Sequence, residues 1–543
     1  MVVLFVSCSL FTNAQFVLQW QQRLGGLATD QANSIIQTTD SGYAVLGTTN
    51  SNDSVVYGNH GGNDFLLFKL DANGNQEWHR WYGSSVDDNA QSIIQTPDGG
   101  YLMAGSTNGN DGDVTGNNGN TDVWLIKTDH LGFIEWQKCY GGTGTDGPTS
   151  YYNNNYYQEN PAGISIINTL DGGYMLGTST NSNNGQVSGN HGGYDYWLVK
   201  LNDTGAIQWQ KCYGADKDEI LTSVIQSADG TYAAAGYSDS DSGQVTGSHV
   251  SCYDDYNYGL ICSYDYWIIK TDTAGNLLWE KSLGGTGDDI ATSIAATDNG
   301  GYIVAGYTVS TDSDVIGNHG SSDYWLVRLD SAGGIVWKNC YGGSSQDEAT
   351  SVIANNNGGF MVVGNSYSID GEVTNHHDSI IYTQDIWAVL LDSMGNITRQ
   401  NSFGGSMNDA ANSVVKTNDG GYAIAGYTNS NDGDVSPSNT EIDFWVVKLN
   451  TNVGINEIKT LSGINLYPNP NNGDFILFCN HSSAMASTGL NITDITGRTV
   501  LQKNLKTGNG KTSITTDLEN GIYFWQLNSE NKTIANGKLI ILK

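Results

Sequence analysis

Acidic side chains recur at regular positions in this sequence, which makes cation binding the first chemistry to consider. An acid stands four residues before a serine at six places, namely Asp30, Asp88, Glu219, Asp289, Asp347 and Asp409. Other acids lie close together, such as Asp111 and Asp113. Carboxylate oxygens are ligands that calcium prefers, but the spacing does not match the calcium-binding loop of an EF-hand.

A residue type that returns many times in one chain more often caps turns and strands than binds a ligand. We therefore expect a structural role for the recurring acids, and also for recurring histidines such as His60 and His376. Calcium binding in the acidic loops is the alternative, and its candidate ligands are Asp111, Asp113, Asp288 and Asp289. The sequence indicates no other metal and no organic cofactor.

Two segments rich in tyrosine offer a different chemistry, the binding of a glycan or a protein. The first contains Tyr151, Tyr152, Tyr156 and Tyr157, and the second contains Tyr253, Tyr256 and Tyr258. A tyrosine ring stacks on a sugar or on a partner surface while its hydroxyl forms hydrogen bonds. Decorative surface loops are the alternative. Cys252 and Cys262 flank the second segment, so we predict a disulfide between them in an oxidising environment.

Catalytic motifs are not found in the sequence. It has no serine, histidine and aspartate signature of a hydrolase and no glycine-rich phosphate loop before a helix. Residues 1–450 contain only the arginines Arg23, Arg80, Arg328 and Arg399, which stand at regular strand positions rather than in a carboxylate-binding cluster. We therefore predict a protein without catalytic activity. A hydrolase whose site is built from unlike repeats is the alternative.

The overall charge narrows the range of partners. The chain has 543 residues with 56 acidic and 23 basic side chains, which give a net charge of −33. Nucleic acid and anionic membranes repel such a chain, so neither is an expected partner. The sequence also contains 69 glycines, 30 tyrosines and 14 tryptophans, a composition typical of a folded protein with many turns.

These residues belong to a repeated unit. An aromatic residue after a glycine-rich turn returns at Tyr43, Tyr101, Tyr174, Tyr232, Tyr302, Phe360 and Tyr422, with a basic period of 58 residues. Insertions of 15 and 12 residues contain the two tyrosine-rich segments. Each unit has four short runs of β-branched and aromatic residues between turns and no helical period. The pattern predicts an all-β protein with a seven-bladed β-propeller.

The order of these runs predicts how the ring closes. The fourth run of a unit carries a tryptophan, as at Trp78 and Trp136, but no such run follows the last unit. Its copy lies at the start of the chain, around Trp20. We therefore expect the N-terminal strand to complete the last blade and so to cover an open sheet edge. The recurring tryptophans should pack between blades rather than bind a ligand.

The N-terminus has the features of a secretory signal peptide. The chain is mostly apolar up to Phe11, and small residues precede a predicted cleavage between Ala14 and Gln15. Cleavage before Cys8, as in a lipoprotein, is the alternative. No other stretch approaches 18 apolar residues, so we predict no transmembrane segment.

The repeat resembles a bacterial β-propeller repeat family. The resemblance rests on a Gly-Gly and Asp-Asp turn that is followed by Ser-Ile, Gly-Gly-Tyr and Asp-aromatic segments. In the fifth unit these residues are Gly284, Gly285, Asp288, Asp289, Ser293, Ile294, Gly300, Gly301, Tyr302, Asp323, Trp325 and Leu329. The resemblance implies an architecture and no particular activity, because this fold carries many functions.

The C-terminal segment resembles the sorting domain of proteins that the type IX secretion system of Bacteroidota exports. Its motif residues are Tyr467, Pro468, Asn469, Pro470, Gly473, Asp494, Gly497, Arg498, Gly521 and Tyr523. Alternating strands and tight turns independently predict a small β-sandwich. The resemblance implies that the secretion machinery is a partner and that the product is released or attached to the cell surface.

Together these patterns predict a signal peptide (1–14), a propeller (15–450), a linker (451–463) and a sorting domain (464–543). Both tyrosine-rich insertions should emerge on one acidic face of neighbouring blades. We predict a secreted or cell-surface propeller that binds a glycan or a protein. An extracellular hydrolase and a structural surface-layer component are the alternatives.

Overall fold

The structure consists of two compact units, residues 1–451 and 452–543. The computed structural model describes residues 16–53, 58–147, 163–255, 259–377, 383–437, 441–450, 464–479, 488–494, 498–505, 511–529 and 532–543. Within these ranges every regular element is a β-strand.

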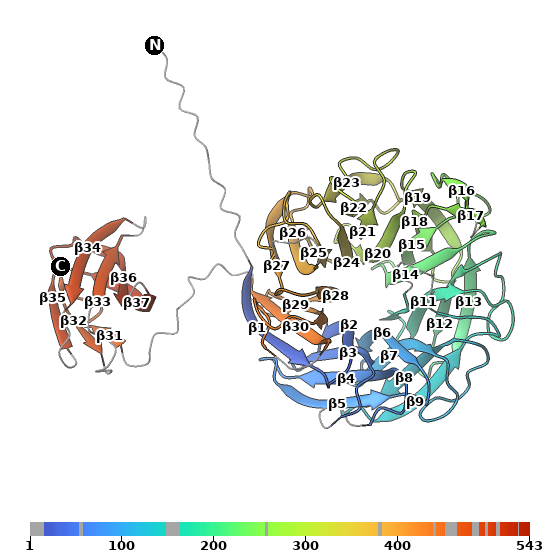
Figure 1. Cartoon of the computed structure of the whole chain (residues 1–543), viewed down its shortest axis with the longest axis horizontal. Coiled ribbons are helices and arrows are strands. Elements are labelled where there is room, and N and C mark those ends of the chain that lie inside the picture. The colour runs from blue at the N-terminus through green and yellow to red at the C-terminus, as the bar shows by residue number, and fades with distance from the viewer. Residues whose placement is uncertain are drawn as a thin grey trace, which may run out of the picture. The chain divides into compact units, whose positions relative to one another are not determined.

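The first unit is a ring of antiparallel sheets, in which the first strand of each sheet lies near the centre and the fourth lies at the outside (Figure 1). The described residues form seven such four-stranded sheets, and the predicted propeller fold is confirmed. Blades 1 to 3 are β2 (Asp30–Gln37), β3 (Tyr43–Thr49), β4 (Asp64–Leu70) and β5 (Gln76–Tyr82); β6 (Asp88–Gln95), β7 (Tyr101–Thr107), β8 (Asp122–Thr128) and β9 (Ile134–Tyr140); and β10 (Ser165–Asn168), β11 (Tyr174–Thr180), β12 (Asp195–Leu201) and β13 (Ile207–Tyr213). Blades 4 and 5 are β14 (Glu219–Gln226), β15 (Tyr232–Ser238), β18 (Asp265–Thr271) and β19 (Leu277–Leu283); and β20 (Asp289–Ala296), β21 (Tyr302–Thr308), β22 (Asp323–Leu329) and β23 (Ile335–Tyr341). Blades 6 and 7 are β24 (Asp347–Ala354), β25 (Phe360–Ser366), β26 (Asp385–Leu391) and β27 (Ile397–Phe403); and β28 (Asp409–Lys416), β29 (Tyr422–Thr428), β30 (Asp443–Asn450) and β1 (Val17–Leu24).

Strand β1 closes the ring. It runs antiparallel to β30, from Val17 opposite Asn450 to Leu24 opposite Phe444, and the blue β1 lies against the orange β30 in Figure 1. The Arg23 side chain forms a buried ion pair with Asp443 of β30. The predicted closure of the last blade by the N-terminal strand is confirmed.

The tryptophans fill the space within and between blades. Those of the third strands are fully buried, at Trp124, Trp197, Trp267, Trp325, Trp387 and Trp445. Those of the fourth strands pack edge-on against the next blade, as Trp78 does against Tyr101 with ring centroids 6.0 Å apart. These contacts give the tryptophans the structural role that the repeat predicts.

The second unit is a small sandwich of two antiparallel sheets. One sheet has the order β31 (Ile464–Tyr467), β32 (Asp474–Cys479), β35 (Lys511–Thr515), and the other has the order β34 (Thr499–Leu505), β33 (Thr488–Thr493), β36 (Gly521–Ser529), β37 (Lys532–Ile541). Buried side chains of both sheets, such as Phe475, Leu490 and Trp525, form one apolar core. The predicted β-sandwich is confirmed.

Candidate functional site

One face of the propeller carries the connections that could form a binding site. Successive strands of a blade run in opposite directions, so the connection into each first strand and the connection from the second to the third strand emerge on the same face. We call it the loop-bearing face. The 12-residue insertion lies there, between β15 and β18 of blade 4.

Several predicted site residues fall outside the described residues. They are Tyr151, Tyr152, Tyr156 and Tyr157 of the first insertion, Tyr256 and Tyr258 of the second, and Ala14 and Gln15 of the cleavage site. Their roles stay predictions.

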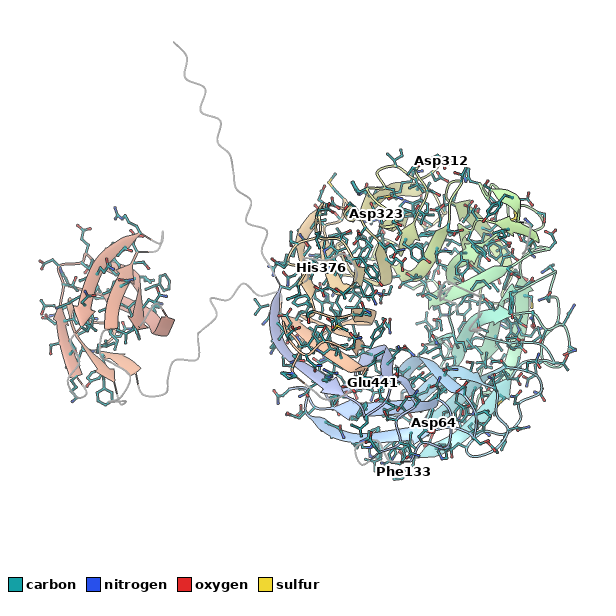
Figure 2. All side chains as sticks on the ribbon, viewed as in Figure 1. Asp64, Phe133, Asp312, Asp323, His376 and Glu441 are labelled. Atoms are coloured by element: carbon teal, nitrogen blue, oxygen red, sulfur yellow. A yellow bond between two sulfur atoms is a disulfide. The ribbon has the colours of Figure 1, made fainter. Side chains whose placement is uncertain are left out.

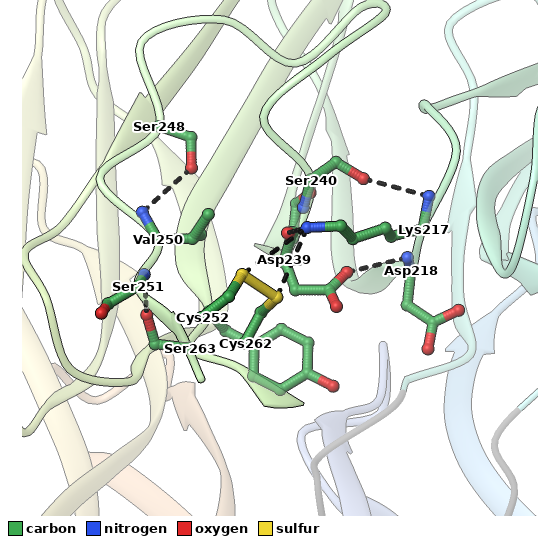
Figure 3. The surroundings of a disulfide bond; sticks show 12 residues. Lys217, Asp218, Asp239, Ser240, Ser248, Val250, Ser251, Cys252, Cys262 and Ser263 are labelled. Carbon is green, nitrogen blue, oxygen red and sulfur yellow. Dashed lines mark hydrogen bonds between the residues drawn. A yellow bond between two sulfur atoms is a disulfide. The ribbon is translucent and has the colours of Figure 1, made fainter. Parts of the chain in front are cut away.

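The second insertion forms a hairpin of β16 (Cys252–Asp255) and β17 (Gly259–Cys262). Cys252 and Cys262 stand opposite each other and form the predicted disulfide. The side chain of Lys217 packs beside it, with Nζ 3.4 Å from Cys262 Sγ and hydrogen-bonded at 3.0 Å to the backbone carbonyl of Asp239 (Figure 3). Lys217 thus anchors the hairpin to the connection that enters blade 4, and Tyr253 remains 61 % exposed on the hairpin.

The recurring acid at the start of each first strand binds the loops beside it. The carboxylate of Asp88 accepts hydrogen bonds from the N–H and the hydroxyl of Ser84, at 2.6 and 2.7 Å. Asp289 accepts one from the N–H of Gly285 at 2.7 Å and one from the hydroxyl of Ser310 at 2.9 Å. Each acid therefore caps the connections of the loop-bearing face, as turn and strand-capping residues do.

The seventh member of this set, Asp146, is not apparent from the four-residue spacing to a serine. Its carboxylate accepts hydrogen bonds from the N–H of Gly142 at 2.7 Å and from the hydroxyl of Ser182 at 2.9 Å. The 15-residue insertion follows Asp146 directly, and β10 has four residues where the other first strands have eight. The glycine pair Gly141 and Gly142 before the acid is the sequence signal that identifies it.

A second buried aspartate opens each third strand, and a histidine covers several of them. The N–H of His60 donates to Asp64 at 2.8 Å, and its ring Nδ1 lies 2.9 Å from the same oxygen. Figure 2 shows Asp64 and Asp323 on different blades of the ring. In blade 6 His377 makes this contact, whereas His376 lies 3.2 Å from the Ser366 carbonyl oxygen. These histidines hold loops, as their recurrence predicts.

Two buried carboxyl groups flank one glycine where neighbouring blades meet. A Cβ atom at Gly284 would collide with carboxyl oxygens of Asp265 and Asp289, so the site requires glycine. Burial raises the pKa of Asp289 to about 7, with a further contribution from the charge of Asp265, and burial raises the pKa of Asp265 to about 6. Burial likewise raises the pKa of the corresponding acids, to about 7 at Glu219 and Asp409 and to about 6 at Asp64 and Asp122.

These carboxyl groups predict that the propeller loses stability as the pH rises. Their pKa is higher in the folded chain than in the unfolded chain, so the folded state binds more protons and its advantage is lost as the pH passes 6 to 7. We expect the melting temperature to fall by about 5 °C or more between about pH 5 and 8. Melting curves across this range, followed by circular dichroism, provide the measurement. The variant Asp289→Asn should show a weaker pH dependence, and an identical slope would contradict the assignment.

The four candidate calcium ligands do not come together. Asp111 and Asp113 belong to blade 2, whereas Asp288 and Asp289 stand at the entry to blade 5. Asp111 accepts hydrogen bonds from the N–H and the hydroxyl of Ser85, at 2.8 and 2.7 Å. Among the residues that the structure describes, no group of three or more His, Cys, Asp and Glu side chains is arranged to hold a metal ion. Calcium binding stays the alternative to the structural role that we predict for these acids.

A cluster without an obvious sequence signal lies beside the hairpin anchor. We call it the acidic rim, and it comprises Asp218, Asp239, Asp288, Tyr237 and Tyr264. The N–H of Asp218 donates to Asp239 at 2.9 Å, the N–H of Tyr264 donates to Asp288 at 3.1 Å, and the rings of Tyr237 and Tyr264 lie 5.1 Å apart. Burial raises the pKa of Asp239 to about 6 and also raises that of Asp288. The rim brings together residues of three connections and one strand.

The motif residues of the second unit stabilise its sandwich. The side chain of Asn469 accepts a hydrogen bond from the N–H of Ile540 on the last strand, at 2.8 Å. Asp494 and Arg498 form an ion pair of 3.1 Å, and Gly473 has a φ of 109°, which favours glycine. The other described motif residues are Tyr467, Pro468, Pro470, Gly521 and Tyr523, while Gly497 lies outside the described residues.

Comparison with known proteins identifies the second unit. Residues 465–542 match the family model of the secretion system C-terminal sorting domain. The C-terminal unit is a sorting domain. The match confirms the resemblance seen in the motifs, and it marks the chain as a secreted or surface-attached protein of the type IX secretion system. In the part of the chain that the structure describes, no helix is long and apolar enough to cross a membrane.

Other matches have low sequence identity or cover a small part of either protein. A segment is 32% identical over 114 residues to the regulatory protein FlaEY of Caulobacter vibrioides, and the match covers 19% of this chain and 12% of that protein. The WD40 domain of Neurospora crassa Pan2 is 9% identical with a TM-score of 0.41, and the match covers 80% of this chain and 96% of that one. An α-L-arabinofuranosidase of Fusarium graminearum is 10% identical with a TM-score of 0.36, and the match covers 63% and 92% of the two chains.

Proposed function

We propose that the propeller is the binding part of an exported protein. The sorting domain directs the chain out of the cell, and the loop-bearing face of blades 3 and 4 binds a glycan or a protein there without catalysis. The observation that carries this proposal is the disulfide-braced hairpin, which exposes Tyr253 and whose base lies next to the acidic rim through Lys217.

The hairpin is suited to binding because it is ordered before a ligand arrives. Its two strands pair over their whole length, and both the disulfide and Lys217 fix its base. A rigid loop loses little conformational entropy on binding, and an exposed tyrosine offers a large contact area with only two rotatable bonds. This reduced entropy cost favours a binding role for the hairpin over the alternative of a surface loop without a ligand.

A glycan array and a panel of extracellular proteins, both probed with the full mature chain, test the proposal. For a ligand found this way, Tyr253→Ala is expected to weaken binding by about tenfold or more, because central aromatic residues dominate binding energies. The melting temperature should change little, since the side chain is exposed. Phe133→Ala is the matched control, because Phe133 is exposed on a third-to-fourth-strand connection of the opposite face. Equal affinity of Tyr253→Ala and the unmodified chain would contradict this site.

An extracellular hydrolase is the second candidate. It is favoured by half-buried carboxyl groups on the loop-bearing face whose pKa burial raises, to about 6 at Asp239 and upward at Glu348. A general acid near neutral pH needs such a pKa. Incubation of each array ligand with the mature chain, followed by product analysis, separates the two candidates: intact ligand supports binding alone, and released fragments that disappear in Asp239→Asn support the hydrolase.

A further inference from the structure

The acidic rim holds three carboxyl groups and one neighbouring cation, Lys217. Asp218, Asp239 and Asp288 are half-buried, and among the described residues none of the three forms a salt bridge. Lys217 is the near cation, but its ammonium group donates to the backbone carbonyl of Asp239 and lies against the disulfide (Figure 3). Each of the three carboxyl groups accepts one backbone N–H. Three half-buried negative charges beside one cation remain costly, and a positively charged ligand group would relieve that cost.

A buried hydroxyl group is aimed into the same cluster. The side chain of Tyr237 has an exposed fraction of 0%, and its hydroxyl has no hydrogen-bond partner within the described part of the chain. Burial, together with nearby Tyr264, Tyr307, Asp218 and Asp288, holds the pKa of Tyr237 well above its usual value. A neutral phenol oxygen accepts a hydrogen bond from an ammonium or guanidinium group, and the aromatic rings around it attract cations.

The surroundings of the rim favour a polypeptide over a sugar as the source of that cation. The connection from β21 to β22 in blade 5, which adjoins the rim, exposes the apolar side chains of Val309 and Ile316, and the N–H of Val309 donates to the carbonyl of Asp288 at 2.9 Å. Asp312 stands in the same connection and accepts a hydrogen bond from the N–H of Thr286 at the entry to blade 5. A surface that mixes apolar groups with one sign of charge fits a protein surface of the opposite charge.

We propose that the acidic rim binds a lysine or arginine side chain of a polypeptide ligand whose contact surface is basic and partly apolar. The proposal rests on the proposed binding function and specifies its ligand class. The carboxylates of Asp218, Asp239 and Asp288 supply the charge, Tyr264 and Tyr307 supply aromatic rings, and the hairpin contacts the adjoining part of the ligand.

Titrations of the full mature chain with synthetic probes test this class. Three peptides of equal length contain serine, valine and either lysine, glutamine or glutamate, and chitosan oligomers provide cationic groups on a glycan. We expect the lysine peptide to bind, with an affinity that falls as salt is raised, and the other two peptides to bind at least about tenfold more weakly. Equal binding of the glutamine peptide would overturn the charge assignment. Binding of chitosan without the lysine peptide would overturn the polypeptide assignment and leave the binding function intact.

Substitutions distinguish binding of the cation at the acidic rim from general attraction by the acidic loop-bearing face. Asp239→Asn and Asp288→Asn keep an oxygen for their backbone N–H donors, and each should weaken binding of the lysine peptide by about tenfold. Asp111→Asn removes the same charge on blade 2 and should change affinity less than about twofold. Tyr237→Phe should weaken binding while the melting temperature stays equal or rises, because the unpaired hydroxyl is removed. The same loss in all three aspartate variants would show diffuse attraction and overturn the assignment.

Discussion

A chain that lacks residues 1–24 is expected to lose the folded propeller, whereas a chain that lacks only residues 1–14, the predicted signal peptide, should melt like the full-length chain. The longer deletion removes β1, and with it the outer strand of blade 7 and the partner of β30. It exposes the edge of β30, removes Phe16 from the core of the last blade and leaves Asp443 without Arg23. A buried acid without its partner is strongly destabilising.

The loss should approach the whole stability of a typical domain, which is about 5–15 kcal/mol. Melting curves of both truncated chains, followed by circular dichroism, provide the measurement, and the shorter deletion controls for loss of the N-terminus as such. A synthetic peptide of residues 16–24 should restore part of the transition in the longer deletion by pairing with β30. Coinciding melting curves of the two chains would show that β1 does not close the ring.

Deletion of residues 464–543 is expected to abolish export in a host that has a type IX secretion system. The segment matches the sorting-domain family and forms a compact unit with its own core. A compact unit of this kind should also direct the export of another protein that is fused to it. We therefore expect a neutral reporter fused to residues 452–543 to appear outside the cell, and the unfused reporter to stay in the periplasm.

Cell fractionation with immunoblotting measures this effect, which should be close to all or none. A known cargo protein in the same cells controls for a working secretion system. Export of the chain without residues 464–543, or retention of the fusion while the control cargo is exported, would contradict the role of this unit.

The repeat made much of the fold predictable. The repeat has a period of 58 residues and four apolar runs, and equivalent runs form the same strand in every blade. The number of strands per blade and the buried positions could therefore both be predicted. The position of β1 was predictable because its tryptophan run is missing after β30 and present around Trp20. The disulfide was predictable because Cys252 and Cys262 flank an insertion, and the pairing of β16 with β17 places them opposite each other.

The acidic rim was not predictable in the same way. Asp239 is the only acid at its repeat position, where other units have residues such as Asn108 and Val309, but the sequence alone does not show that Asp218 and Asp288 lie near it. Their relation depends on how blades 4 and 5 adjoin and on the direction of the Tyr237 side chain, which are properties of packing between blades. The four-residue spacing to a serine did not identify Asp146, because an insertion separates this acid from the first strand of its blade.

Hydrogen–deuterium exchange of the mature chain, with and without its tightest-binding probe, tests most directly whether the loop-bearing face at blade 4 and at the entry to blade 5 is the binding site. We expect protection in residues 214–219, 237–242, 250–263 and 284–289, because these segments contain the hairpin, its Lys217 anchor and the acidic rim. Residues 38–42 and 129–134, on the opposite face, should exchange as in the free chain. Protection confined to the opposite face or to the sorting domain would contradict the proposed site.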